Sequence, residues 1–136
     1  MKISAITEPV TPLPVCPPNV LKGDYAKIIE AHQAIMANLS MPMPTIAELA
    51  RTSNMSPSKF RKLFLQIYGN SVYQYHLNAR LELAKELLLS NQYSIVQIAY
   101  KVGFSRSQSF AKAFLAHTGQ TATDYKKDIL YKTLNQ

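Results

Sequence analysis

From about residue 24 onward, apolar side chains recur every three or four positions, which is the spacing of amphipathic helices. The first such stretch predicts a helix from about Asp24 to Leu39, and Pro42 and Pro44 prevent its continuation. Residues 1–23 lack this pattern, and the first 20 of them include five prolines. They are predicted to form an irregular tail or the remnant of a linker between domains.

The starts of several later helices are marked by a serine or threonine followed three positions later by a residue that can complete a capping box. These pairs are Thr45 with Glu48, Ser71 with Gln74, Ser94 with Gln97, and Thr121 with Asp124. Ser56 before Pro57 marks another helix, because serine caps a first turn and proline suits its first position. Ser105 precedes one more, whose apolar positions begin at Phe110. The pattern therefore predicts seven helices without a strand, which is an all-α domain.

Two segments of the chain repeat one another. Ile46, Leu49, Ala50, Met55, Ser56, Phe60, Phe64 and Gly69 correspond to Ile95, Ile98, Ala99, Phe104, Ser105, Phe110, Phe114 and Gly119. The offset is 49 residues up to Ser56 and 50 residues beyond it. Each copy reads as a short helix, a turn and a second helix, which is a helix-turn-helix arrangement. Helical solenoids have repeats of similar length but usually need at least three copies.

The repeat divides the chain into parts. Two helix-turn-helix units are predicted at about residues 45–69 and 94–119, joined by a long helix over about residues 71–89. A last helix starts at about residue 121. With 136 residues in all, the chain has room for one compact domain, which is expected to cover residues 24–136.

Charge adds a candidate partner. Fifteen Lys and Arg against eight Asp and Glu give a net charge of +7. The intervals between Glu48 and Glu82 and between Glu86 and Asp124 contain cations and no acid. Such stretches favour binding to a polyanion, although a charge excess that only improves solubility explains them equally well.

Few features point to secretion, membranes or metals. Cys16 is the single cysteine and cannot form an internal disulfide, which agrees with a reducing compartment and predicts a cytoplasmic protein. No apolar run approaches the roughly 20 residues of a membrane helix, and the prolines interrupt any signal peptide. His32 is expected in the core or at its boundary, and neither a metal nor another cofactor is expected.

The repeat carries a more specific set of residues. Its most specific members are Ile95, Ala99, Gly103, Phe104, Phe110, Phe114, Gly119 and Tyr125, supported upstream by Leu49, Ala50, Ser56, Phe60, Phe64, Gly69, Tyr75, Arg80, Ala84 and Leu87. In this spacing the chain resembles, from about Tyr25 to Lys127, the DNA-binding domain of the AraC/XylS family of bacterial transcription regulators. Asn54, Ala122 and Lys126 depart from the glycine, proline and arginine usual there.

The resemblance implies sequence-specific binding to double-stranded DNA and regulation of transcription. The family's base-reading positions correspond to Ser58, Arg61 and Lys62 in the first unit and to Ser107, Gln108 and Lys112 in the second. Their chemistry agrees, because Arg and Lys suit guanine, Gln suits adenine, and Ser can address either. Each chain is expected to place its two recognition helices in successive major grooves, about 34 Å apart, on an asymmetric site.

Other polar residues near the two units are candidates for contact with the DNA backbone. These are Ser56, Lys59, Lys101, Ser105 and Arg106. Ser105 has an alternative reading as the first member of a capping box with Gln108. Arg80, on the long helix, is expected either to face phosphate or to pair with Glu48 or Glu82. Tyr73, Tyr75 and Tyr100 are expected to pack between helices rather than to stack on nucleotides.

Competing functions are less well supported. Domains of this kind also occur in alkylation-repair proteins that use activated cysteines, but Cys16 stands alone in a proline-rich tail and no catalytic group accompanies it, so no enzyme is expected. A helical adaptor that binds protein or single-stranded nucleic acid is the alternative. The resemblance also suggests contact with RNA polymerase and, if the chain is a C-terminal piece, an upstream ligand-sensing domain.

Overall fold

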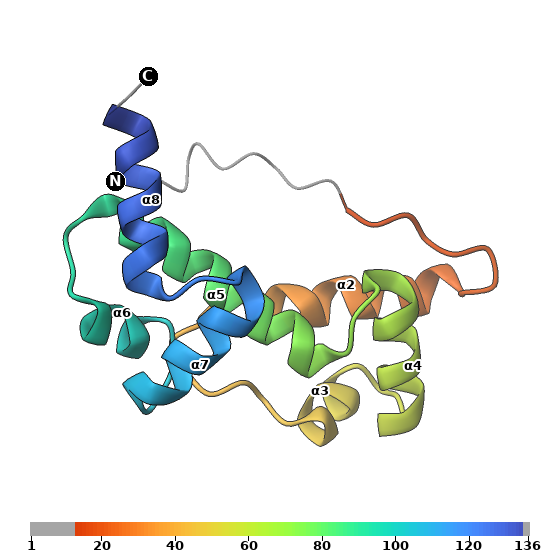
Figure 1. Ribbon diagram of the computed structural model, residues 1–136. Helices are drawn as coiled ribbons and strands as arrows, with labels where there is room; N and C mark the ends of the chain where they lie inside the picture. Colours follow the sequence, from red (N-terminus) through yellow and green to blue (C-terminus); the bar gives the residue numbers. More distant parts are fainter. Residues whose placement is uncertain (1–12, 135–136) are drawn as a thin grey trace.

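The computed structural model describes residues 13–134, and within them the chain forms seven helices and no strand (Figure 1). The helices are α2 (Lys22–Met36), α3 (Ile46–Thr52), α4 (Pro57–Tyr68), α5 (Val72–Ser90), α6 (Ile95–Lys101), α7 (Ser107–Thr118) and α8 (Ala122–Leu134). The predicted all-α class is confirmed. The first helix starts and ends earlier than its predicted bounds of Asp24 and Leu39.

Capping explains where the two short helices begin. The Thr45 hydroxyl accepts a hydrogen bond from the Glu48 backbone N–H at 3.1 Å, and the Glu48 carboxylate accepts one from the Thr45 N–H at 2.9 Å. Ser94 and Gln97 make the same reciprocal pair, at 3.1 and 2.8 Å. Both predicted capping boxes are therefore confirmed, and each satisfies two helix-end donors.

The predicted box at the start of α5 forms only in part. The Ser71 hydroxyl accepts from the Gln74 N–H at 3.1 Å, but the Gln74 side chain donates to Asn78 Oδ1 at 2.9 Å instead of returning to Ser71. Asn78 lies one helical turn further along the same face, so it competes for the amide.

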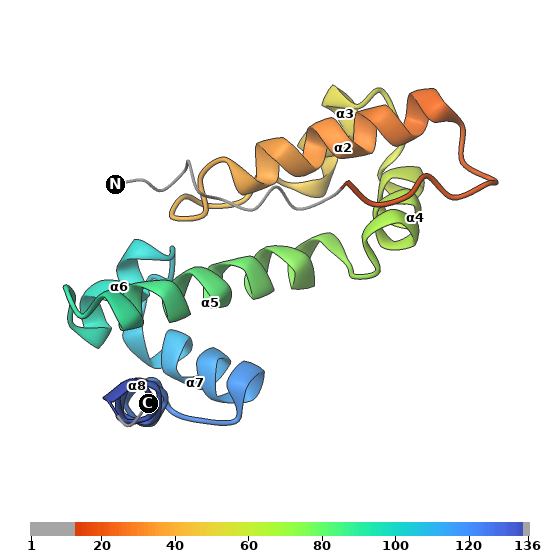
Figure 2. The ribbon, with the colours of Figure 1, turned by 90° about the horizontal axis from the view of Figure 1, so that it is seen from above.

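Two separate groups of buried side chains hold the fold together. The first is built on α2, α3 and α4 and ends at Val72 of α5. The second begins at Leu81 of α5 and is built on α6, α7 and α8. Figure 2 shows α5 between the two groups, with α2 and α3 on one side of it and α7 and α8 on the other. Below, α3 and α4 are called the first unit, and α6 and α7 the second unit.

Part of the predicted tail packs onto the first unit. Residues 1–12 of that tail lie outside the described residues. Of the rest, Val20 is buried in the first core, and the Tyr25 hydroxyl donates to the Pro14 carbonyl. The Gln66 amide donates to Asn19 Oδ1 at 2.7 Å. The irregular segment before α2 thus takes part in the fold, because an apolar side chain within it finds a place in the core.

Candidate nucleic-acid interface

The second helix of each unit buries one face and exposes the other. Phe60 and Phe64 on α4, like Phe110 and Phe114 on α7, are spaced four residues apart and are fully buried. This spacing places them on one side of the helix, so Arg61 and Lys62 on α4, like Ala111 and Lys112 on α7, face outward. In Figure 1 the N-terminal ends of α4 and α7 both lie at the lower edge of the molecule, on either side of the long helix.

The predicted base-reading residues of α4 lie on its outward side. Ser58, Arg61 and Lys62 are all exposed. Within residues 13–134, none of their side chains makes a hydrogen bond or an ion pair. An exposed guanidinium and ammonium without an acidic partner are available for an anionic or acceptor-rich ligand.

The predicted residues of α7 are similarly placed. Gln108 and Lys112 are exposed, while Ser107 is half-buried as the first residue of the helix. Their side chains also have no partner in the part of the chain that the structure describes. The two outward faces therefore differ, because α4 presents two cations and α7 presents one cation and one amide.

Two of the residues predicted to contact the DNA backbone already make contacts within the protein. The Ser56 hydroxyl caps α4 by accepting from the Lys59 N–H at 3.2 Å, and Lys59 Nζ forms an ion pair with Asp24 Oδ2 at 3.1 Å. A hydroxyl that accepts one hydrogen bond can still donate to a phosphate. Lys59 would have to share its charge between Asp24 and DNA.

Lys101 lies at the end of α6, with its Nζ 4.4 Å from the centre of the Tyr93 ring. Among residues 13–134 the Lys101 ammonium has no acidic partner, and its contact with the ring leaves it accessible to an anion.

The interpretation of Ser105 as a helix cap is wrong. The N-cap of α7 is Arg106, in extended backbone conformation with φ −140° and ψ 135°, and it makes no side-chain cap hydrogen bond. Arg106 is the residue by which the repeat offset grows from 49 to 50, so it takes the place that Ser56 holds in the first unit. Ser105 therefore lies one residue before the N-cap, and both Ser105 and Arg106 are exposed.

The turns of the two units share one backbone feature, a left-handed residue at matching positions. Asn54 has φ 58° and Gly103 has φ 95°, both in the left-handed region. Asparagine is one of the few residues with a side chain that visits this region routinely. The departure from glycine at Asn54 is therefore compatible with a normal turn.

Arg80 does not pair with either predicted glutamate. Its Nε donates to the Leu39 carbonyl and its Nη2 to the Met41 carbonyl, both at 3.0 Å. Glu48 is occupied by the capping box. Glu82 accepts from Lys85 at 2.8 Å and lies 2.9 Å from His117 Nε2, and these hydrogen bonds lower the pKa of its carboxyl.

A polar cluster at the edge of the first core accounts for His32. Its Nε2 lies 2.8 Å from the Tyr75 hydroxyl, and its ring stacks on Tyr68 with centroids 4.3 Å apart. Burial lowers the pKa of His32 and raises that of Tyr68 to about 12, so both groups are uncharged at neutral pH. The predictions that His32 lies at the core boundary and that Tyr75 packs between helices are confirmed.

The other two tyrosines do not pack as predicted. Tyr73 is 68% exposed and Tyr100 is 53% exposed. Both lie on the outer sides of their helices, away from the two cores. An apolar ring alone does not predict burial, because single exposed aromatic side chains are common on protein surfaces.

One cation near the site was not among the predicted residues. Arg51 is exposed in the last turn of α3 and, together with Asn54, Ser56 and Pro57, lines a surface hollow of about 430 Å³ beside the start of α4. Its position in the acid-free stretch after Glu48 was the available signal. The repeat did not reveal it, because the matching residue in the second unit is Tyr100.

None of the helices within residues 13–134 combines the length and the apolar character needed to cross a membrane.

Comparisons with known proteins agree with this geometry. A family model described as a helix-turn-helix domain matches residues 49–128. Among curated relatives, the HTH-type transcriptional regulator AlkR of Acinetobacter baylyi is 39% identical over 76% of this chain and 33% of its own length. The probable transcriptional regulator LumQ of Photobacterium leiognathi is 37% identical over 60% of this chain and 33% of its own. The chain spans about a third of the length of these relatives.

Solved structures share the arrangement of helices. The C-terminal domain of AraT, a response regulator from Geobacillus stearothermophilus, matches 75% of this chain and 84% of that domain with a TM-score of 0.69 and 29% identity. The DNA-binding domain of AdpA, in complex with a target DNA, matches 78% of this chain and 95% of that domain with a TM-score of 0.72. At a sequence identity of 21%, this structural likeness shows a common fold.

Proposed function

The chain belongs to the AraC-type helix-turn-helix family, and on that premise we propose that it binds a specific site on double-stranded DNA through α4 and α7 and regulates transcription. The observation that carries this proposal is the pair of outward helix faces. Each belongs to the second helix of a helix-turn-helix unit, and each presents exposed polar groups without partners in the described chain. Such a helix enters the major groove in helix-turn-helix proteins.

The proposed base contacts follow from the side chains. Arg61 and Lys62 suit the O6 and N7 acceptors of guanine, and Gln108 suits the N6 donor and N7 acceptor of adenine. Ser58, Ser107 and Lys112 complete the two sets. Arg61 and Gln108 are the main discriminators, because a guanidinium and an amide can make two hydrogen bonds to one base.

The proposed phosphate contacts lie around the helix starts. Arg106 and Ser105 flank the N-terminal end of α7, which has no side-chain cap and no acidic residue in its first turn. Free N–H groups and a positive helix end favour a phosphate there. Ser56, Lys59 and Arg51 surround the corresponding end of α4, and Lys101 ends α6.

A single chain is proposed to span two half-sites. Both recognition helices belong to one polypeptide, so they would occupy successive major grooves about 34 Å apart. Because the two faces differ, the half-sites would differ as well, in contrast to the palindrome read by a two-fold dimer. The AdpA domain, which shares this fold, was solved with a target DNA, and this supports duplex DNA as the ligand. A bacterial gene regulator acts in the cytoplasm, and we propose that location.

Selection of bound duplexes from a random pool, followed by a salt titration on the selected site, tests the proposal. We expect a 1:1 complex with a footprint of about two helical turns, unlike half-sites, and affinity that falls steeply with salt. Single-stranded RNA and random duplex should compete poorly. Binding by two chains to a palindrome would contradict the bipartite reading, and equal binding to RNA would contradict the function. The predicted contact with RNA polymerase and the upstream sensing domain stay predictions.

A further inference from the structure

The relative placement of the two units depends on the region around Arg80 in the long helix. Val72 of α5 belongs to the first core and Leu81 to the second. Arg80 directly precedes Leu81, where α5 joins the second core. Its guanidinium donates to the carbonyls of Leu39 and Met41, both at 3.0 Å. Those carbonyls belong to the connection between α2 and α3, which leads directly into the first unit.

The same guanidinium also touches the second unit. Its Cζ lies 5.8 Å from the centre of the Phe104 ring, and Phe104 in turn packs against Phe110 of α7 with ring centroids 5.5 Å apart. One side chain of α5 therefore contacts the connection to the first unit and the turn of the second.

Gly103 shows independently that the second turn lies tightly against this connection. A Cβ atom at this position would lie 2.6 Å from the Leu39 carbonyl oxygen and 2.7 Å from Arg80 Cζ. Only glycine lets the backbone approach so closely. The asparagine at the equivalent place in the first unit, Asn54, is exposed and has no such restriction.

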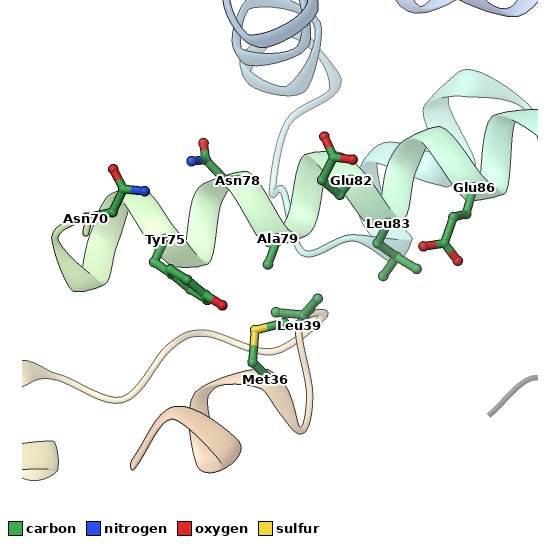
Figure 3. A pocket seen from close by; sticks show the side chains of 9 residues that line it. All are labelled: Met36, Leu39, Asn70, Tyr75, Asn78, Ala79, Glu82, Leu83 and Glu86. Atoms are coloured by element: carbon green, nitrogen blue, oxygen red, sulfur yellow. The ribbon is translucent and has the colours of Figure 1, made fainter. Parts of the chain in front are cut away.

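Beyond the hydrogen bond between His32 and Tyr75, the neighbouring contact between α2 and α5 is loose. Figure 3 shows Met36 and Leu39 facing Tyr75, Ala79 and Leu83 of α5 across a groove. This groove has a volume of about 510 Å³. Because α2 and α5 do not close tightly at this end, the hydrogen bonds of Arg80 become a main restraint on the α2–α3 connection relative to the second unit.

We propose that Arg80 is a positioning residue that fixes the orientation of the two helix-turn-helix units relative to each other, and thereby the half-site spacing that the chain accepts. The part that concerns DNA rests on the function proposed above. Arg80 itself does not contact DNA in this proposal. Its role is to hold α4 and α7 in one arrangement before binding, which lowers the ordering cost of binding.

Half-site spacing is a sensitive readout of such an arrangement. One additional base pair moves a half-site by about 3.4 Å along the duplex and rotates it by roughly 34°. A rigid pair of recognition helices cannot follow both changes without distorting the DNA. A pair joined more loosely can adjust, so it should tolerate altered spacing.

The first test needs no DNA. Leu65 and Leu115 are exposed at equivalent positions of α4 and α7, so Leu65→Cys and Leu115→Cys, in a Cys16→Ala background, can carry spin labels. Distances between the labels are measured by double electron–electron resonance. We expect a narrow distribution in the otherwise unchanged protein and a clearly broader one in Arg80→Met, which keeps the chain length but removes both donors.

Lys27→Met is the matched control, because Lys27 is an exposed lysine on α2 whose loss changes the charge equally. It should leave the distribution narrow. Circular dichroism must show that Arg80→Met is folded. If it is not, Arg80→Lys keeps the charge but cannot reproduce the paired guanidinium donors, and it should also broaden the distribution. A distribution that stays narrow in a folded Arg80→Met, or in Arg80→Lys if that variant has to decide, would overturn the proposal.

The second test uses the selected DNA site with its spacer lengthened or shortened by one or two base pairs. The unchanged protein should lose affinity on the order of tenfold for one base pair, whereas Arg80→Met should lose no more than about threefold. A preference that stays sharp in Arg80→Met would overturn the link to spacing. If the unchanged protein shows no bipartite site, the proposed function fails, while the distance measurement still decides the role of Arg80.

Discussion

The first and second units place phenylalanines at matching positions, begin their first helices with equivalent capping boxes, and end their second helices at left-handed glycines, Gly69 and Gly119. They differ where the chain faces outward. Arg61 of α4 has Ala111 as its counterpart on α7, and Ser58 has Gln108. The framework was thus kept in both copies, while the exposed faces diverged.

A second difference lies at the start of the second helix. Ser56 caps α4, whereas the additional residue Arg106 occupies the cap position of α7 without capping it. A serine cap stabilises a helix by about 1 kcal/mol. An arginine at the cap position does not make this contribution, but it places a cation beside the free N–H groups of the first turn. The start of α7 therefore has a cation where the start of α4 has a capping hydroxyl.

The largest expected effect tests the equivalence of the two frameworks. Phe60→Ala and Phe110→Ala remove matching side chains that are both fully buried. Each should lower the free energy of unfolding by about 3–5 kcal/mol, because a cavity replaces the ring. Urea unfolding followed by circular dichroism gives both values. A loss below about 1 kcal/mol for either variant would show that its unit is not built as described.

The turns should respond differently to exchanged residues. Gly103→Asn should lower the stability by about 1–3 kcal/mol, since its Cβ would meet the Leu39 carbonyl oxygen and the Arg80 guanidinium. Asn54→Gly should change it by less than about 1 kcal/mol, because both residues accept the left-handed conformation. Thermal melting of the two variants measures the contrast. Equal losses would show that the close approach at Gly103 does not exist in solution.

Base reading should separate the two outward faces. Arg61→Ala should weaken binding to the selected site by about 1–3 kcal/mol and relax the preference at one base pair in the half-site read by α4. The half-site read by α7 should keep its preference. Binding to a set of single-base variants of the site provides the measurement. An unchanged preference throughout would remove Arg61 from the proposed base-reading set.

Arg106 should act on the phosphate backbone and therefore on all sequences alike. Arg106→Ala is expected to weaken specific and random duplexes by a similar factor and to reduce the slope of log K against log salt by about 0.9. Salt titrations of both duplexes supply the slopes, with Lys27→Ala as the control for loss of charge. A change confined to one base pair would instead make Arg106 a base-reading residue.

The smallest expected effect concerns a pair between α7 and α5 that has no counterpart on α4. His117 of α7 lies against Glu82 of α5, whereas its counterpart in the first unit, Ile67, is buried. The pKa of Glu82 is lowered from its ordinary value of 4.5 by the hydrogen bonds from Lys85 and His117. Its ionised form therefore stabilises the folded state above about pH 4.5, and this contribution is lost as the pH falls through the lowered pKa.

In Glu82→Gln the melting temperature should accordingly fall less steeply below about pH 4.5 than in the unchanged protein. The difference should be small and should shrink in high salt, because the Glu82 side chain is largely exposed. Glu86→Gln, one helical turn further along, is the control and should keep the original slope. Identical profiles for all three proteins would show that the pair does not contribute.

Local signals explain what could be predicted from the sequence. The seven helices follow from apolar spacing and from the capping boxes of Thr45 and Ser94, because these depend on residues within a few positions of each other. The exposure of five of the six predicted base-reading residues, all but Ser107, follows from the buried phenylalanines on the opposite side of each helix. Their contacts with DNA stay predictions.

Non-local contacts account for what was missed. Arg80 donates to carbonyls about 40 residues away, and backbone carbonyls carry no signature in the sequence. Lys59 pairs with Asp24 because α2 packs against α4, which is likewise invisible from local spacing. Ser105 was misassigned for a different reason. A single additional residue after it shifts the helix start, and the serine alone fits a cap equally well.

The division into two cores along α5 also bears on how the chain opens and closes. Each core draws its buried side chains from a separate stretch of sequence, with Val72 at the end of one and Leu81 in the other. Regions built in this way often open as separate cooperative units, so we expect the amide hydrogens of the two cores to exchange at different rates. On the function proposed above, we also expect α4 or α7 to unfold transiently while the other keeps its structure, so that a bound chain releases one half-site without leaving the DNA.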